Sequence, residues 1–83
     1  MEKPSVSFAD DIRPLFRDID IAHMSPFGVL LDDYAYMSNP DNATLVYAFL
    51  DGTREPRMPI RGPYWTDAQL KLYSDWMAGG RQP

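Results

Sequence analysis

The chain has 83 residues, no cysteine and a formal net charge of −4 at pH 7. This length makes one domain, residues 1–83, for which we expect short tails at residues 1–5 and 81–83. The lack of cysteine excludes disulfide bonds, and one histidine is too few for a structural zinc site. The net negative charge argues against nucleic acid as a partner, because phosphate binding needs a basic surface. No apolar run reaches the about 18 residues that a membrane-spanning helix needs.

The first predicted helix begins at Ser7, which forms a near capping box with Asp10. Pro14 lies inside the helix and is expected to kink or divide it, because proline lacks an N–H and crowds the preceding turn. The apolar residues of this segment fall on one face at helical spacing, and they are Phe8, Ile12, Leu15 and Phe16.

Shorter segments are predicted in the middle of the chain. Asp20 is expected to cap a short turn that carries His23 and ends at Pro26. Another short helix is expected from Asp32 or Asp33, and residues 39–42 predict a turn.

Two further helices are predicted in the second half of the chain. The first covers residues 43–51 and stops at Gly52, and its buried stripe consists of Leu45, Val46, Phe49 and Leu50. Residues 53–63 contain three prolines and three arginines, which predicts an ordered loop in extended conformation. The last helix begins at a capping box of Thr66 and Gln69, and Gly79-Gly80 ends it. Its predicted buried stripe is Leu70, Tyr73, Trp76 and Met77. No segment predicts a strand, so the class is all-α.

Taken together, residues 6–80 resemble a small class I cytochrome c. The Ser7-to-Phe16 run is similar to the helix before that family's Cys-x-x-Cys-His motif. The Arg57-Met58-Pro59 loop and the last helix resemble its methionine-ligand loop and terminal helix. His23 stands at the histidine of the motif, but Ile19 and Ala22 replace the two cysteines, so thioether attachment of heme is impossible. The resemblance implies three principal helices joined by short turns.

The same resemblance makes His23 and Met58 the ligands of any heme iron. An imidazole and a thioether suit an electron-transfer heme, here a noncovalent heme b. An empty cleft of several hundred Å³ would cost about 10 kcal/mol at ~24 cal/mol per Å³, which rivals the stability of a small domain. Bulky residues between the two ligand positions favour a core filled by side chains, without a cofactor. The leading expectation is therefore a heme-free module, and the alternative is an electron-transfer or heme-sensing protein.

Arg54, Arg57 and Arg61 form the one basic concentration in the chain, next to Tyr64 and Trp65. Arginine, tyrosine and tryptophan dominate interface hot spots, so we predict that these five residues bind a partner protein. The alternative is a solvated loop that balances the aspartates.

The partner implied by the resemblance is a larger, redox-related protein, and the domain itself is expected to be an accessory module. It is not expected to be an enzyme, because no serine or cysteine nucleophile accompanies the single histidine. A chain without cysteine, and without an apolar signal region at its start, is expected in the cytoplasm.

Overall fold

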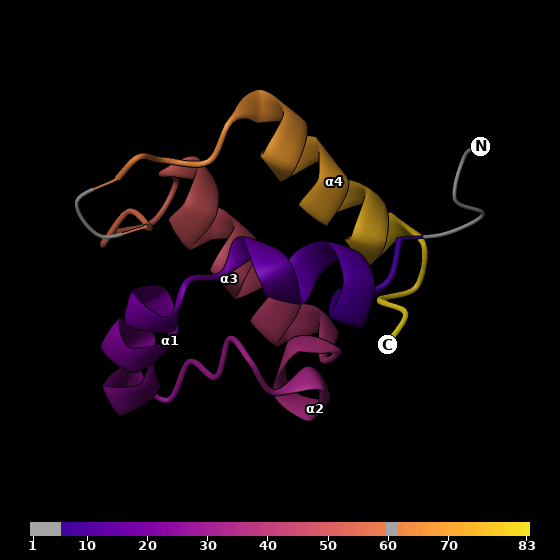
Figure 1. Ribbon diagram of the computed structural model, residues 1–83, viewed down its shortest axis with the longest axis horizontal. Helices are drawn as coiled ribbons and strands as arrows, with labels where there is room; N and C mark the ends of the chain where they lie inside the picture. Colours follow the sequence, from indigo (N-terminus) through magenta and orange to yellow (C-terminus); the bar gives the residue numbers. More distant parts are fainter. Residues whose placement is uncertain (1–5, 60–61) are drawn as a thin grey trace.

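The computed structural model describes residues 6–59 and 62–83, and helical segments make up the fold over these ranges (Figure 1). In chain order they are the π-helical turn η1 (Phe8–Ile12), the 3₁₀ turn η2 (Arg13–Leu15), α1 (Asp18–Met24), the 3₁₀ turn η3 (Ser25–Phe27), α2 (Tyr34–Met37), α3 (Pro40–Asp51) and α4 (Asp67–Ala78). No strand occurs in the described part, where a single bridge pairs Ser7 with Gln82. The predicted all-α class is confirmed. None of the described helices has the length and apolarity to cross a membrane.

The N-terminal helical segment changes its winding at the predicted place. The Ser7 hydroxyl accepts from the Asp10 N–H at 3.1 Å, and the Ser7 N–H donates to the Asp11 carboxylate at 2.8 Å. In this wide π-helical turn it is therefore Asp11, and not Asp10, that accepts the Ser7 N–H and completes the capping box. The π-helical turn ends at Ile12 and a 3₁₀ turn begins at Arg13, directly before Pro14. The predicted division of this helix is confirmed.

The predicted capping role of Asp20 is confirmed in part: its carboxylate accepts the backbone N–H of the N-cap residue, but Asp20 is the third residue of the helix and not the N-cap itself. Helix α1 begins two residues earlier, at Asp18, and Arg17 is its N-cap residue. Asp20 is buried at 3% exposure, and its carboxylate accepts from the Arg17 backbone N–H at 2.9 Å and from the Arg17 guanidinium at 3.0 and 3.1 Å. A buried carboxylate is costly unless it is paired and hydrogen-bonded, and Arg17 supplies both conditions.

The starts of α2 and α3 follow from side-chain caps. The Asp33 carboxylate accepts from the Ala35 N–H at 3.0 Å, so the predicted short helix begins where expected. Helix α3 begins at Pro40, three residues before the predicted start. The Asn39 side chain accepts from two N–H groups of the first turn, at 2.9 and 3.3 Å, and proline is well suited to the first helical position. The predicted turn at residues 39–42 is therefore the N-terminus of a helix.

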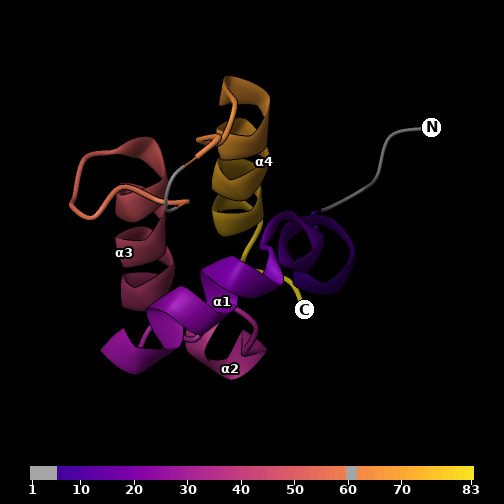
Figure 2. The same ribbon diagram turned by 60° about the vertical axis from the view of Figure 1, so that its left-hand side comes forward.

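Helices α3 and α4 lie side by side and run in opposite directions, as both ribbon views show (Figure 2). The capping box at the start of α4 is confirmed, with Thr66 and Gln69 bonded at 2.8 and 3.2 Å. The Tyr73 hydroxyl donates to the Ala43 carbonyl at 2.9 Å and so links α4 to α3. The buried hydrophobic residues form one cluster: Phe8, Ile12, Phe16, Met24, Val29, Leu31, Met37, Ala43, Val46, Phe49, Leu50, Met58, Trp65, Tyr73 and Trp76.

The C-terminal residues are tied to the rest of the fold. The Gln82 carbonyl accepts from the Trp76 indole at 2.9 Å and from the Phe8 N–H at 2.8 Å. The Arg81 guanidinium donates to the Ser38 carbonyl at 2.9 Å. Residues 81 and 82, expected as part of a tail, therefore hold the N-terminal segment against α4. The tail expected at residues 1–5 lies outside the described residues.

Candidate functional site

His23 and Met58, the two candidate heme ligands, lie in different surroundings. His23 is in the last turn of α1, partly exposed, with its ring 5.9 Å from the ring of Phe27. Met58 is only 1% exposed and belongs to the hydrophobic core. Its backbone N–H donates to the Phe49 carbonyl at 2.9 Å, which fixes this part of the chain against the end of α3.

His23 is partly exposed and Met58 is enclosed in the core, so the two side chains do not share a surface opening among the described hollows. Neither His23 nor Met58 lines the two surface depressions described below. Ile19 and Ala22, at the positions of the missing cysteines, are both exposed, and Ile19 reaches 63%. The thioether of Met58 is instead surrounded by the protein's own core. In the described part of the chain, no three His, Asp or Glu side chains gather as a metal site either.

Residues 53–66 join the two long helices and are called here the α3–α4 loop. Over residues 53–59 this loop does not have the extended conformation predicted for residues 53–63. Its backbone bends at residues 53–56 and again at residues 58–59. Two of its N–H groups bond back to the last turns of α3, from Arg54 to the Ala48 carbonyl at 3.0 Å and from Met58 to the Phe49 carbonyl. These carbonyls lack partners within a helix, so the loop turns back to satisfy them.

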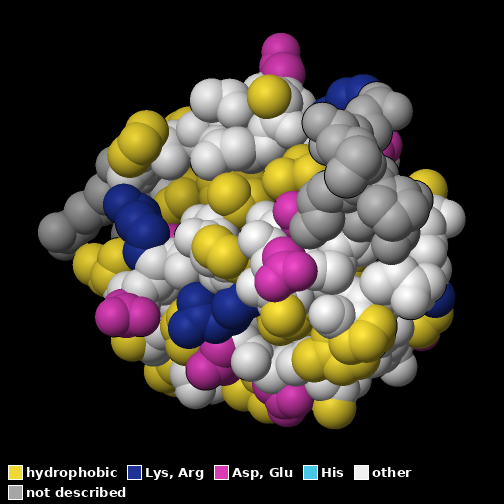
Figure 3. Space-filling view, turned by 45° about the vertical axis from the view of Figure 1, so that its right-hand side comes forward, with side chains coloured by type: hydrophobic (Ala, Val, Ile, Leu, Met, Phe, Trp, Pro, Cys, Tyr) yellow, Lys and Arg dark blue, Asp and Glu magenta, His cyan; other side chains and the backbone are white. Residues whose placement is uncertain are grey.

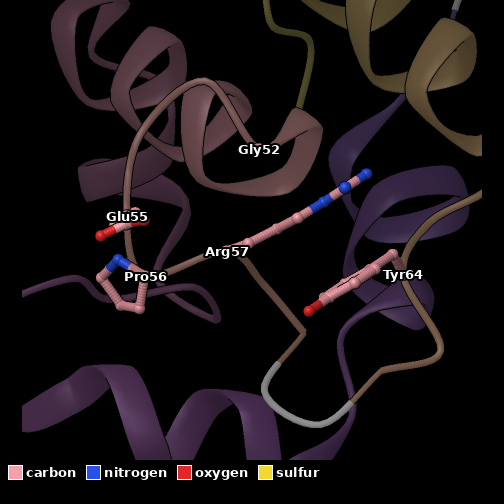
Figure 4. A pocket seen from close by; sticks show the side chains of 5 residues that line it. All are labelled: Gly52, Glu55, Pro56, Arg57 and Tyr64. Atoms are coloured by element: carbon pink, nitrogen blue, oxygen red, sulfur yellow. The ribbon is translucent and has the colours of Figure 1, made fainter.

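Arg57 and Tyr64 of this loop form an arginine–tyrosine stack. The Arg57 guanidinium carbon lies 4.2 Å from the centre of the Tyr64 ring, within the range of a cation–π contact. Figure 4 shows the Arg57 side chain between Tyr64 and the Gly52 end of α3, with Glu55 and Pro56 on the other side of the loop. Together, Gly52, Glu55, Pro56, Arg57 and Tyr64 line an open surface hollow, the arginine depression.

Charged neighbours complete the electrostatics of the arginine depression. The guanidinium of Arg54 lies 5.9 Å from the Phe49 ring. Hydrogen bonds from Thr53 lower the pKa of Asp51, and the charge of Arg57 adds to that effect. The Asp51 carboxylate accepts from the Thr53 N–H at 2.8 Å. Within residues 6–59 and 62–83, neither Arg54 nor Arg57 forms an ion pair with a carboxylate.

Trp65, one of the five residues predicted to bind a partner, is buried in the core. Trp65 is 6% exposed, and its ring lies 5.4 Å from Phe16 and 6.1 Å from Tyr73. An indole that fills the gap between the N-terminal segment and α4 removes more apolar surface from water than one on the loop surface. Tyr64 is 49% exposed, so the predicted pair is divided between the surface and the core. Arg61, the third predicted basic contact, lies outside the described residues.

A second hollow, the proline depression, lies on another side of Tyr64. Three prolines line it, Pro14, Pro59 and Pro63, together with Leu15, Tyr64 and Trp65. Its polar lining consists of Arg17, Thr66 and Gln69. An Arg17 guanidinium nitrogen lies 3.5 Å from the Gly62 carbonyl, so this arginine also connects α1 to the loop. Sequence reasoning missed this hollow, because it joins prolines that lie about 45 residues apart and no local pattern links them.

Exposed apolar side chains outside the loop were also missed. Ile19 is 63% exposed, and Phe27, one of the bulky residues between the two ligand positions that were expected to fill the core, is 68% exposed. They belong to α1 and η3, whose single fully buried apolar residue is Met24. The face in Figure 3 carries acidic and basic side chains interspersed among apolar ones, so no field of a single sign covers it.

Comparisons of the chain with protein-family models, with curated proteins and with solved structures found no match. The resemblance to class I cytochrome c therefore depends on sequence motifs alone and stays a prediction.

Proposed function

We propose that this chain is a heme-free, cytochrome c-like accessory domain that binds another protein through the α3–α4 loop. The Arg57–Tyr64 stack is the observation that supports this function most. It presents a cation and a half-exposed aromatic ring side by side, and among the described residues the cation forms no ion pair with a carboxylate. These residue types dominate hot spots in protein interfaces. In this proposal the domain catalyses no reaction.

The closed interior supports the heme-free part of the proposal. Met24, Met37 and Met58 are 1%, 0% and 1% exposed and pack in the same cluster as Trp76. Methionine adapts its shape well to irregular gaps, so in this proposal these side chains fill the interior in place of a cofactor. The large cost of an empty cleft, about 24 cal/mol per Å³, is thereby avoided.

The partner proposed for this domain carries an acidic or mixed-charge surface. Arg54 and Arg57 are exposed and attract carboxylates, whereas the chain as a whole has a net charge of −4. Association should therefore weaken with salt, because exposed charge pairs are screened. That the partner is a larger redox protein follows only from the cytochrome resemblance, and this is part of the proposal.

Affinity capture from cells of the source organism tests the interaction, with wild type, Arg57→Ala and Lys71→Ala as baits. Lys71 lies on α4 and pairs with Asp75 at 2.9 Å, so its removal changes the net charge equally without touching the loop. A protein recovered with wild type and Lys71→Ala, but not with Arg57→Ala, is then purified and titrated. The proposal predicts saturable, salt-sensitive binding of that purified partner. Equal recovery of every protein by all three baits would contradict it.

A visible absorption spectrum tests the heme-free state. We expect no Soret band after expression in a heme-sufficient host or after addition of hemin. A band of near-stoichiometric strength that His23→Ala abolishes would instead support the electron-transfer or heme-sensing function, with heme b bound through His23 and Met58.

A further inference from the structure

Tyr64 separates two hollows of different chemistry, the arginine depression and the proline depression. We propose that together they bind one short segment of the partner, in which a carboxylate lies next to an apolar side chain. The carboxylate pairs with Arg57, and the apolar side chain enters the proline depression. This inference rests on the proposed function and specifies which part of the partner protein the domain binds.

Arg57 is held in place before any partner arrives. Gly52 has φ +85°, and a Cβ atom there would lie 3.0 Å from both Cδ and Nε of Arg57. The glycine thus lets the arginine side chain lie directly against the end of α3, while the Tyr64 ring covers its other side (Figure 4). A guanidinium that is fixed between two surfaces loses little rotamer freedom on binding. Its planar fork matches the two oxygens of a carboxylate.

The surroundings of Arg57 favour a single carboxylate over a phosphate. Glu55 lies on the other side of the loop, and the Asp51 carboxylate is bonded to Thr53, so neither neutralises the guanidinium by contact. Both acidic groups remain close in the chain, and the net charge is −4. A phosphate carries more negative charge than a carboxylate and needs more cationic partners, whereas Arg57 is the one cationic side chain among the described residues that line the arginine depression.

The proline depression is suited to an apolar side chain. Proline rings present rigid apolar surface and no N–H group, and the Leu15 and Trp65 side chains extend it. Arg17 also lines this hollow, but its charge is paired with Asp20 at 3.0 Å. The proline depression therefore has no free cation for a carboxylate. The carboxylate of the bound segment is expected at Arg57, and its apolar side chain in the proline depression.

The carboxylate has two possible sources, an Asp or Glu side chain or the C-terminus of the partner. Two libraries of random heptapeptides separate them, one displayed with free C-termini and one displayed internally. Both are selected on immobilised full-length protein. Internal enrichment of Asp or Glu beside Leu, Ile or Phe indicates a side-chain carboxylate, and enrichment of a terminal apolar residue in the free library alone indicates the C-terminus.

The selected peptides are then synthesised and titrated by fluorescence anisotropy against wild type and variants whose folding is checked by circular dichroism. We expect Arg57→Ala and Arg57→Lys each to weaken binding about tenfold, since lysine lacks the fork; tenfold corresponds to ~1.4 kcal/mol. Tyr64→Ala should weaken it similarly, Tyr64→Phe should not, and Lys71→Ala serves as the charge control. Replacing the peptide carboxylate by an amide should reproduce the loss.

Consensus peptides without a carboxylate, equal binding by Arg57→Ala, or no enrichment in either library would overturn this inference. The proposed function would still stand if the captured partner bound wild type and failed to bind Arg57→Ala. If that partner binding were also absent, the proposed function itself would be wrong.

Discussion

The hydrophobic core and the exposed part of the α3–α4 loop use their large side chains in opposite ways. In the core, Trp76 of α4 and Met58, which the loop contributes, are 0% and 1% exposed and serve packing. In the loop, Arg57 and Tyr64 stack at the surface and leave the guanidinium without an ion pair in the described part of the chain. Arg57 and Met58 are adjacent in sequence, yet the Arg57 side chain is exposed and the Met58 side chain is buried. Stability and recognition should therefore be separable by substitution.

Trp76→Ala should have the largest effect on the core side of this comparison. Trp76 is fully buried, contacts Phe8 and Tyr73 ring to ring, and donates its indole N–H to the Gln82 carbonyl. Its removal leaves a large cavity and breaks the bond that holds the C-terminus, so we expect a loss of about 3–5 kcal/mol. Urea denaturation measures this loss. A change below about 1 kcal/mol, typical of surface sites, would show that the helix packing is wrong.

Met58→Ala should destabilise the protein by about 2–5 kcal/mol, because the side chain is enclosed in the core. Met58→Leu is the matched control and should cost less than about 1.5 kcal/mol, since it conserves volume. Denaturant unfolding of both variants measures the loss of stability, which is large if Met58 packs in the core and small if it is only a heme-ligand residue facing an open pocket. An effect near zero for Met58→Ala would mean that the residue lines an open or solvated pocket.

Tyr73→Phe should cost about 1 kcal/mol, because it removes the hydroxyl that donates to the Ala43 carbonyl. Burial also raises the pKa of Tyr73 well above its usual value of 10.0. A phenol whose pKa is raised in the folded state contributes stability that is fully present below pH 10 and is lost as the pH rises further. Wild type should thus lose stability above about pH 10 more steeply than Tyr73→Phe. Tyr47→Phe, at a half-buried ring that stacks on Tyr73, is the control. Parallel alkaline melts for wild type and Tyr73→Phe would contradict this account.

Thr66→Ala should cost about 1 kcal/mol by removing the N-cap of α4, whereas Thr66→Ser should keep the cap and most of the stability. Thermal unfolding of the three proteins measures the difference. Equal stability of the alanine and serine variants would mean that the capping box contributes nothing.

These variants also mark the parts of the fold that the sequence predicts well. The cap of α4, the stop at Gly52 and the burial of Trp76 depend on residues close in sequence, and each is confirmed. Asp20 was expected to stand before its helix, whereas it is the third residue of α1, where its buried carboxylate accepts the N-cap N–H and also pairs with the Arg17 guanidinium. Burial of that kind depends on tertiary packing, which local patterns do not encode.

The candidate site was predicted only in part for the same reason. Composition indicated Arg54, Arg57 and Tyr64, but nothing local showed that Trp65 would leave the surface to pack on Phe16. The contact between Arg57 and Tyr64 depends on how the loop bends back onto α3. Three prolines in the loop predicted stiffness but not the direction of that bend.

The most direct test of this account is the pair of values measured for Arg57→Ala, its free energy of unfolding and its affinity for the captured partner. Losing the contact with Tyr64 should lower stability by no more than about 1 kcal/mol, as expected for an exposed cation–π pair. Partner affinity should fall about tenfold or more, which corresponds to at least ~1.4 kcal/mol. Unchanged affinity in the folded variant would contradict the central claim that the α3–α4 loop is a binding surface.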